Sequence, residues 1–158
     1  MQPRIETLPE KKLIGYHLTM TLTHDKTAEL WQRFMKDRKE IHNVMGPDLY
    51  NIKIYNKEYF EQFNPADTFE KWAAVEVKDW DHIPLGMSGF LLQDGLYAIF
   101  DYKGSNSDHR IFEYIYMTWL PASAYIIDDR PHVDVLGANY KNADPASEEE
   151  IRIPIKLK

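Results

Sequence analysis

Residues 13–21 read LIGYHLTMT, and apolar side chains occupy alternate positions of this stretch: Ile14, Tyr16, Leu18 and Met20. A period of two is typical of a β-strand with one buried face. From Thr27 to about Ile41 the apolar residues recur instead at three- and four-residue spacing. That spacing predicts an amphipathic helix. The chain therefore begins its folded part with a strand followed by a helix.

Two strands complete this first half of the chain. Gly46-Pro47-Asp48 ends the helical region, and strand patterns follow over Leu49–Tyr55 and Phe69–Val77, with a loop at Asn64-Pro65 between them. The first half thus has the order strand, helix, strand, strand.

The second half repeats this plan. A strand over Leu96–Tyr102 precedes a helix that begins at Ser107 or Asp108 and ends near Leu120, where Pro121 stops it. Further strands are predicted at Ala124–Ile127, His132–Leu136 and Glu149–Lys156. We therefore expect a single α+β domain over residues 1–158, with halves at roughly 11–79 and 92–156. Its sheet is mostly antiparallel and carries two helices on one face, which leaves the opposite face free for a ligand.

Composition excludes several classes of function. The formal net charge of −6 argues against direct nucleic-acid binding, which depends on Lys and Arg, and no DNA-binding domain is recognisable. No apolar run is long enough to span a membrane or to form a signal peptide, so we expect no membrane association and a cytoplasmic location. The absence of cysteine fits a reducing compartment. Aromatic residues make up 13% of the chain and suit a core, an interface or a ligand pocket equally.

Several runs of the second half resemble one family. They are YAIFDYKG at 97–104, IFEYIY at 111–116, WLP at 119–121, DRPHVDVL at 129–136 and EIRIPIK at 150–156. Together they are similar to the GyrI-like effector-binding family, whose bacterial members occur alone or attached to DNA-binding regions in AraC-type and MerR-type transcription regulators. The resemblance implies a curved sheet with pseudo-two-fold symmetry, a pocket near its axis on the open face, and small-molecule binding of the multidrug type.

The resemblance also implies a pocket carboxylate. The family's glutamate follows the RP turn and corresponds here to Asp134, while an aromatic position of the last strand corresponds to Arg152. If both side chains face one cavity, the pocket is closer to neutral than in relatives that prefer lipophilic cations. In such a pocket Asp134 would attract a cationic group of the ligand or act as a general base. The alternative is that Asp134 is a solvent-exposed residue of the strand with no functional role. Arg152 would keep Asp134 in its ionised form or bind an acidic group of the ligand. The alternative is that Arg152 is a surface arginine with no functional role.

Aromatic residues would supply the pocket walls. Trp119 is either a pocket wall or ordinary helix core, and Tyr116 shares its helix. Tyr16, Trp72 and Tyr97 lie on predicted strands, where they would stack on a ligand or fill the core. Glu76 is a second candidate carboxylate. No metal site, nucleophile elbow or phosphate loop is recognisable, so we expect no cofactor.

Three functions remain open. The first is binding of a hydrophobic or aromatic small molecule, as a sensor, sequestering or detoxifying protein. The second, implied by some members of the family, is hydrolysis of strained cyclopropane-type electrophiles, with Asp134 as base and Tyr97 or Tyr116 assisting. The third is inhibition of a protein partner, as in family members that inhibit DNA gyrase.

Overall fold

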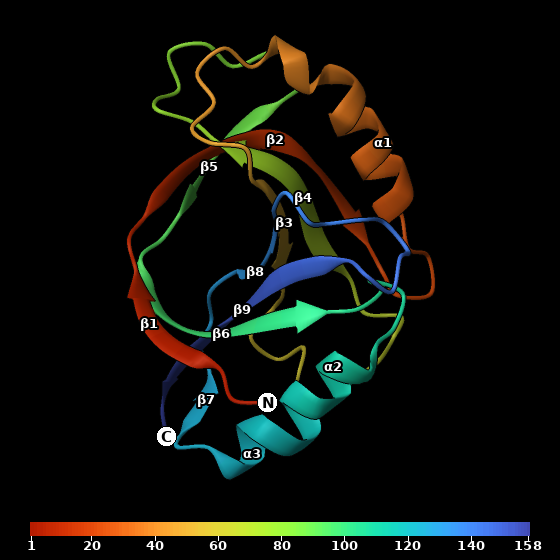
Figure 1. Ribbon diagram of the computed structural model, residues 1–158, viewed down its shortest axis with the longest axis vertical. Coiled ribbons are helices and arrows are strands. Elements are labelled where there is room, and N and C mark those ends of the chain that lie inside the picture. Colours follow the sequence, from red (N-terminus) through yellow and green to blue (C-terminus); the bar gives the residue numbers. More distant parts are fainter.

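The computed structural model describes residues 1–158 and contains a nine-stranded antiparallel sheet with two helical regions on one face (Figure 1). The strands are β1 (Arg4–Leu8), β2 (Lys11–Met20), β3 (Leu49–Ile54), β4 (Phe69–Glu76), β5 (Ser88–Leu92), β6 (Gly95–Lys103), β7 (Tyr125–Ile127), β8 (His132–Leu136) and β9 (Glu148–Leu157). This confirms the predicted α+β class. None of the helices has the length and apolar character that crossing a membrane would require.

The order of the strands reflects the internal repeat. It is β1-β6-β9-β8-β3-β4-β2-β5, with β7 paired to β9. From one end the order is β1-β6-β9-β8, and from the other end it is β5-β2-β4-β3, so each strand of one half has a counterpart in the other half. The two halves meet where β3 pairs with β8. The centre of the sheet is therefore built from both halves of the chain.

Two strands, β1 and β5, were not expected from the sequence. β1 pairs with β6, and β5 pairs with β2, so that β1–β2 and β5–β6 run side by side as one bent two-stranded ribbon. The register of this pairing stays the same from Arg4↔Ile99 to Gly15↔Ser88. Figure 1 shows this ribbon as the arc of red and green strands on the side away from the helices. β1 lies at an edge and is mostly exposed, so it lacks the alternation that marks a half-buried strand.

The two helical regions differ in regularity. The first is α1 (Thr27–Asp37), extended by a 3-10 turn, η1 (Arg38–Glu40). The second consists of α2 (Arg110–Tyr114), a π-helical turn, η2 (Ile115–Trp119), and α3 (Leu120–Ala122). The region ends at Ala122, one residue after Pro121 and close to the predicted end near Leu120.

Three apolar clusters form the core. One lies between α1 and the sheet, around Phe34, and another lies between α2 and the sheet, around Ile115. The third lies on the opposite face, where the ribbon residues Leu13 and Leu92 pack against Trp72. The ribbon thus covers much of the face that sequence analysis left open.

Gly15 allows β2 to pack closely against β4. A Cβ atom at this position would lie 2.0 Å from the carbonyl oxygen of Ala73, which is backbone and cannot move aside as a side chain would.

Gly15→Ala is therefore expected to lower the free energy of unfolding by about 1–3 kcal/mol. Urea denaturation measures the change. Gly137→Ala, whose Cβ would have 3.4 Å to its nearest neighbour, is the control and should stay within about 0.5 kcal/mol of wild type. Equal stability of the two variants would contradict this account.

Candidate ligand-binding site

Asp134 occupies the centre of the sheet on the face that carries the helices. It pairs with Asn51 in the β3–β8 ladder, and only 6% of its surface is exposed. The Lys53 ammonium lies 3.1 Å from its Oδ2 atom, and the Asn51 amide donates a hydrogen bond of 3.0 Å to the same oxygen. The carboxylate is therefore buried but fully partnered, as a buried charge must be.

Both helices contact the partners of Asp134. Trp31 of α1 donates its indole N–H to the Asn51 Oδ1 atom at 3.1 Å, and the Lys53 ammonium lies 4.6 Å from the ring centre of Phe112 in α2. A second lysine, Lys71, pairs with Lys53 in the β3–β4 ladder. We call Asn51, Lys53, Lys71 and Asp134 the central polar cluster.

Burial and neighbouring charges change the pKa values of both lysines. Burial opposes the charge of Lys53, but the Asp134 carboxylate, together with Tyr55 and Glu149, outweighs it, and the pKa of Lys53 is raised. Lys71 has no such partner, so burial and the positive charge of Lys53 lower its pKa to about 8. The cluster therefore holds one balanced ion pair and one lysine that loses its proton near pH 8.

An aromatic cluster borders these polar groups. It consists of Tyr55, Tyr59 and Phe60 after β3, with Tyr116 of η2 and His132 of β8. Phe60 stacks on Tyr116 and on His132, with ring centres 5.2 and 5.4 Å apart. The Tyr116 hydroxyl lies 3.1 Å from His132 Nδ1. Burial lowers the pKa of His132 well below its usual value and raises that of Tyr116 well above its own, so both are neutral at pH 7.

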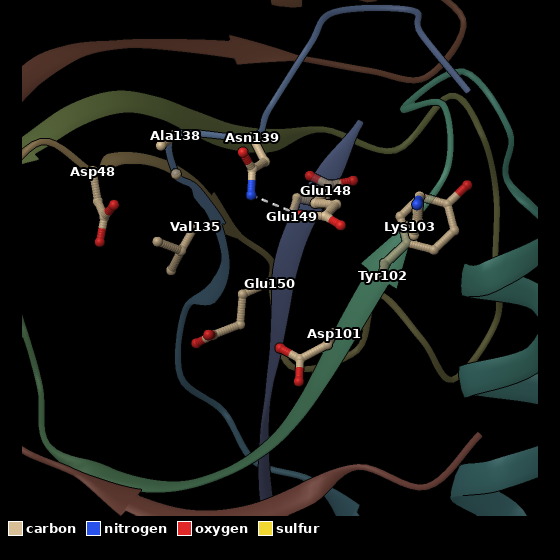
Figure 2. Close-up of a pocket in the computed structure, with 11 residues that line it drawn as sticks. Asp48, Asp101, Tyr102, Lys103, Val135, Ala138, Asn139, Glu148, Glu149 and Glu150 are labelled. Atoms are coloured by element: carbon tan, nitrogen blue, oxygen red, sulfur yellow. Dashed lines mark hydrogen bonds between the residues drawn. The ribbon is translucent and has the colours of Figure 1, made fainter. Parts of the chain in front are cut away.

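An acidic pocket of about 400 Å³ opens where β6 and β8 end and β9 begins (Figure 2). Its charged lining residues are five acids and one lysine: Asp48, Asp101, Glu148, Glu149, Glu150 and Lys103. Glu149 links this pocket to the central polar cluster, because burial and the negative charge of Asp134, opposed by Lys53, raise its pKa to about 7. Asp101 and Glu150 leave the sheet on the face opposite Asp134, so Glu149 is the pocket residue that brings negative charge to the helix side.

The structure divides the predicted site residues between the two faces of the sheet. Those on the helix face are Tyr16, Tyr116, Trp119 and Asp134, and those on the opposite face are Trp72, Glu76, Tyr97 and Arg152. The carboxylate therefore lies on the helix side, whereas sequence analysis placed the pocket on the other side.

Asp134 and Arg152 do not share a cavity. In the β8–β9 ladder Asp134 pairs with Ile151, and Arg152 pairs with Val133, so their side chains leave the sheet in opposite directions. Arg152 binds Glu150 through a 2.7 Å hydrogen bond. Of the possibilities left open by the sequence, a pairing of Arg152 with Asp134 is therefore excluded, and the cation that neutralises Asp134 is Lys53.

The other predicted residues of the helix face pack away from Asp134. The Tyr16 hydroxyl donates to Asp37 at 2.7 Å, within the core under α1. Trp119 packs edge-on against Phe100 and stacks on Tyr125, beside a separate outward groove.

On the opposite face, Trp72 stacks on His17 with ring centres 4.4 Å apart, and Glu76 binds Lys11 at 3.4 Å. Tyr97 is buried beneath the Arg130 guanidinium, and its hydroxyl has no partner. None of these three side chains contacts Asp134.

Sequence reasoning missed Asn51, Lys53, Lys71 and Glu149. A signal for the first two was present, because Asn51 and Lys53 share one face of a strand whose other residues are apolar. The contact of these two residues with Asp134 depends on the register of β3 against β8, which brings together residues more than eighty positions apart in the sequence. The local sequence pattern does not indicate this register. No group of three or more potential metal ligands is present.

The chain thus folds as a curled sheet of two similar halves, with two helical regions on one face. Residues 4–155 match the family model described as Cass2, integron-associated effector binding protein. The chain belongs to this family, which confirms its resemblance to GyrI-like domains. A comparison with curated proteins gives no significant match.

Solved structures share the fold at low sequence identity. SAV2435 bound to tetraphenylphosphonium has a TM-score of 0.73 and 16% identity, and the match covers 99% of this chain and 94% of that one. The EcmrR C-terminal domain has a TM-score of 0.75 and 12% identity, over 99% and 98% of the two chains. The integron cassette protein VCH_CASS2 of Vibrio cholerae has a TM-score of 0.67 and 13% identity, over 98% and 96%.

Proposed function

We propose that this protein binds a hydrophobic, aromatic small molecule on the helix face of the sheet, beside Asp134, as a sensor, sequestering or detoxifying protein. The observation that carries the proposal is the central polar cluster, in which a buried carboxylate is held by Lys53 and Asn51. Buried ion pairs are costly, and a fold that needed only stability would do as well with apolar residues there. Fixed polar groups beside aromatic rings are the usual composition of a ligand pocket.

The aromatic cluster would supply the apolar walls. Phe60 lies over Tyr116 and His132 and belongs to the long segment between β3 and β4, which contains turns and no regular element. A ligand ring would replace Phe60 in these stacking contacts if this segment moved outward. Long loops without regular structure are common over binding sites.

Glu149 favours a ligand that carries positive charge. Its side chain leaves β9 on the same face as Ile151 and therefore on the helix side, whereas Glu148 and Glu150 leave on the opposite side. Since Lys53 already balances Asp134, the charge of the ligand would be recognised chiefly at Glu149. At neutral pH a cation near Glu149 would favour the ionised form of that carboxyl. We therefore propose an aromatic cation as the preferred ligand class.

A matched pair of ions tests this proposal. Tetraphenylphosphonium and tetraphenylborate have nearly the same shape and opposite charges, and each is added to the purified protein in a thermal melt. At a hundredfold excess over its dissociation constant, a ligand stabilises the fold by about 2.7 kcal/mol, which raises Tm by roughly 5–10 °C for a chain of this size. We expect this shift with the phosphonium and a much smaller one with the borate.

Two other outcomes of this experiment would change the proposal. Equal shifts would mean that the site binds aromatic groups without recognising their charge. If neither ion shifted Tm, the proposal of an aromatic cation would be abandoned, and protein partners of the gyrase-inhibitor type would be tested next.

A second candidate function is hydrolysis of a strained electrophile. The neutral Tyr116–His132 pair favours it, because a phenol that keeps its proton is able to donate it to a leaving group. Tyr97, the other phenol considered, faces away from Asp134 and is not a partner in this scheme. Turnover of cyclopropane-bearing compounds, followed by mass spectrometry and lost in Tyr116→Phe, would support this function over simple binding.

A further inference from the structure

Lys71 is a buried lysine without a carboxylate partner. Only 9% of its surface is exposed, and no Asp or Glu lies within ion-pair distance of its ammonium group. Lys53 is its direct neighbour in the β3–β4 ladder, so two lysines lie side by side, and Asp134 forms its ion pair with Lys53. Lysines placed beside another cation in a desolvated site are the ones that act as nucleophiles in proteins.

A hydroxyl and a carboxylate connect Lys71 to the surface. Its Nζ atom donates a 2.7 Å hydrogen bond to the Thr27 hydroxyl, and Thr27 in turn donates to Asp25, at the exposed start of α1. Such a chain is able to carry protons between a buried amine and solvent.

We propose that Lys71 is a nucleophile that captures ligands bearing an aldehyde or ketone group as a Schiff base. The inference rests on the proposed function, because the carbonyl compound would occupy the same helix-face site. No other lysine of the cluster is free to react, since Lys53 is bound to Asp134.

The step balances without a cofactor. The neutral Lys71 amine attacks the carbonyl carbon, so a C–N bond forms and the C=O π electrons move to oxygen. Proton transfer from nitrogen to oxygen through Thr27 and Asp25 gives a carbinolamine. Loss of its hydroxyl as water then leaves the C=N bond. One carbonyl and one amine are thus converted to one imine and one water molecule.

The charges around Lys71 make its neutral form available near physiological pH. Burial and Lys53 lower the pKa of Lys71 to about 8, while Asp25 and Asp134 act in the opposite direction with smaller effect. An exposed lysine has a pKa of about 10.4, so at pH 8 Lys71 has a roughly hundredfold larger share of free amine.

Reductive trapping tests the proposal. The full chain is incubated with benzaldehyde and cyanoborohydride, and labelled lysines are located by peptide mass spectrometry. We expect Lys71 to acquire a benzyl group at least about tenfold faster than the exposed Lys39 at pH 8, with a rate midpoint near that pH. Lys71→Arg, which keeps a positive charge, should abolish this fast labelling, and the matched control Lys39→Arg should leave it unchanged.

Tetraphenylphosphonium separates the two proposals. If it stabilises the fold while Lys71 is labelled no faster than Lys39, the Schiff-base inference fails and the binding function stands. If Lys71 is labelled rapidly but the phosphonium neither stabilises the protein nor slows labelling, the reactive lysine stands and the proposed ligand class fails. Fast labelling that persists at other lysines in Lys71→Arg would overturn the assignment of the nucleophile.

Discussion

Asp134→Ala is expected to lower the free energy of unfolding by about 3–5 kcal/mol, because it leaves Lys53 buried without a counterion. Both members of the pair are about nine-tenths buried, so water cannot replace the lost carboxylate without a rearrangement. The substitution also removes the acceptor for the Asn51 amide. Urea denaturation at pH 7 measures the loss, and the thermal shift caused by tetraphenylphosphonium should disappear in parallel.

A double variant separates stability from binding. In Asp134→Leu combined with Lys53→Met, both charges are absent, and apolar pairs of similar volume are often as stable as the ion pair they replace. We expect the double variant to recover most of the lost stability but not the response to the phosphonium. A loss below about 1 kcal/mol in Asp134→Ala would show that the pair is not held as described. Binding that survives in the double variant would remove Asp134 from the site.

Local patterns were sufficient to predict most of the fold. The alternation around Tyr16 and the helical spacing around Phe34 correspond to β2 and α1. Each of these elements buries one face against the core, and that burial produces the period seen in the sequence. β1 was missed because it is exposed along nearly its whole length and shows no alternation. β5 was missed because its exposed Leu91 is as apolar as the partly buried Phe90 and the buried Leu92, so the alternation in burial is absent from the sequence.

The site was harder to predict than the fold for a related reason. Alternation within β8 indicates that Asp134 points away from Val133 and Val135, and this holds in the structure. It does not indicate which face of the sheet the helices cover, or that Lys53 from the other half lies opposite. Both facts depend on long-range register, and the composition of a single strand contains no information about it.

The two halves make unequal contributions to their junction. β3 supplies the amide and the lysine, and β8 supplies the carboxylate, so neither half holds a complete ion pair. A ligand at this junction would contact both helices, since Trp31 and Phe112 each touch a member of the cluster. Binding would thereby couple the two halves of the domain.

Glu149→Gln is expected to stabilise the protein at pH 8 and to have little effect at pH 4.5. The pKa of Glu149 is raised from 4.5 to about 7, so between these values the folded state binds more protons than the unfolded state. Stability from this group is therefore greatest below pH 4.5 and is lost as the pH rises through 7. Glutamine stays neutral throughout and avoids the loss. At 1.36 kcal/mol per pKa unit, reduced for partial exposure, the gain at pH 8 is about 2–3 kcal/mol.

Urea denaturation of both proteins at the two pH values measures this difference, and the phosphonium ion connects it to binding. The charge that destabilises the free protein at pH 8 is the one proposed to attract the ligand, so Glu149→Gln should gain stability and lose affinity together. Wild type should also respond more strongly to the phosphonium at pH 8 than at pH 5. If the variant is more stable at both pH values, the gain does not arise from ionisation of Glu149. If it binds the phosphonium as tightly as wild type, the charge of the ligand is not recognised at Glu149.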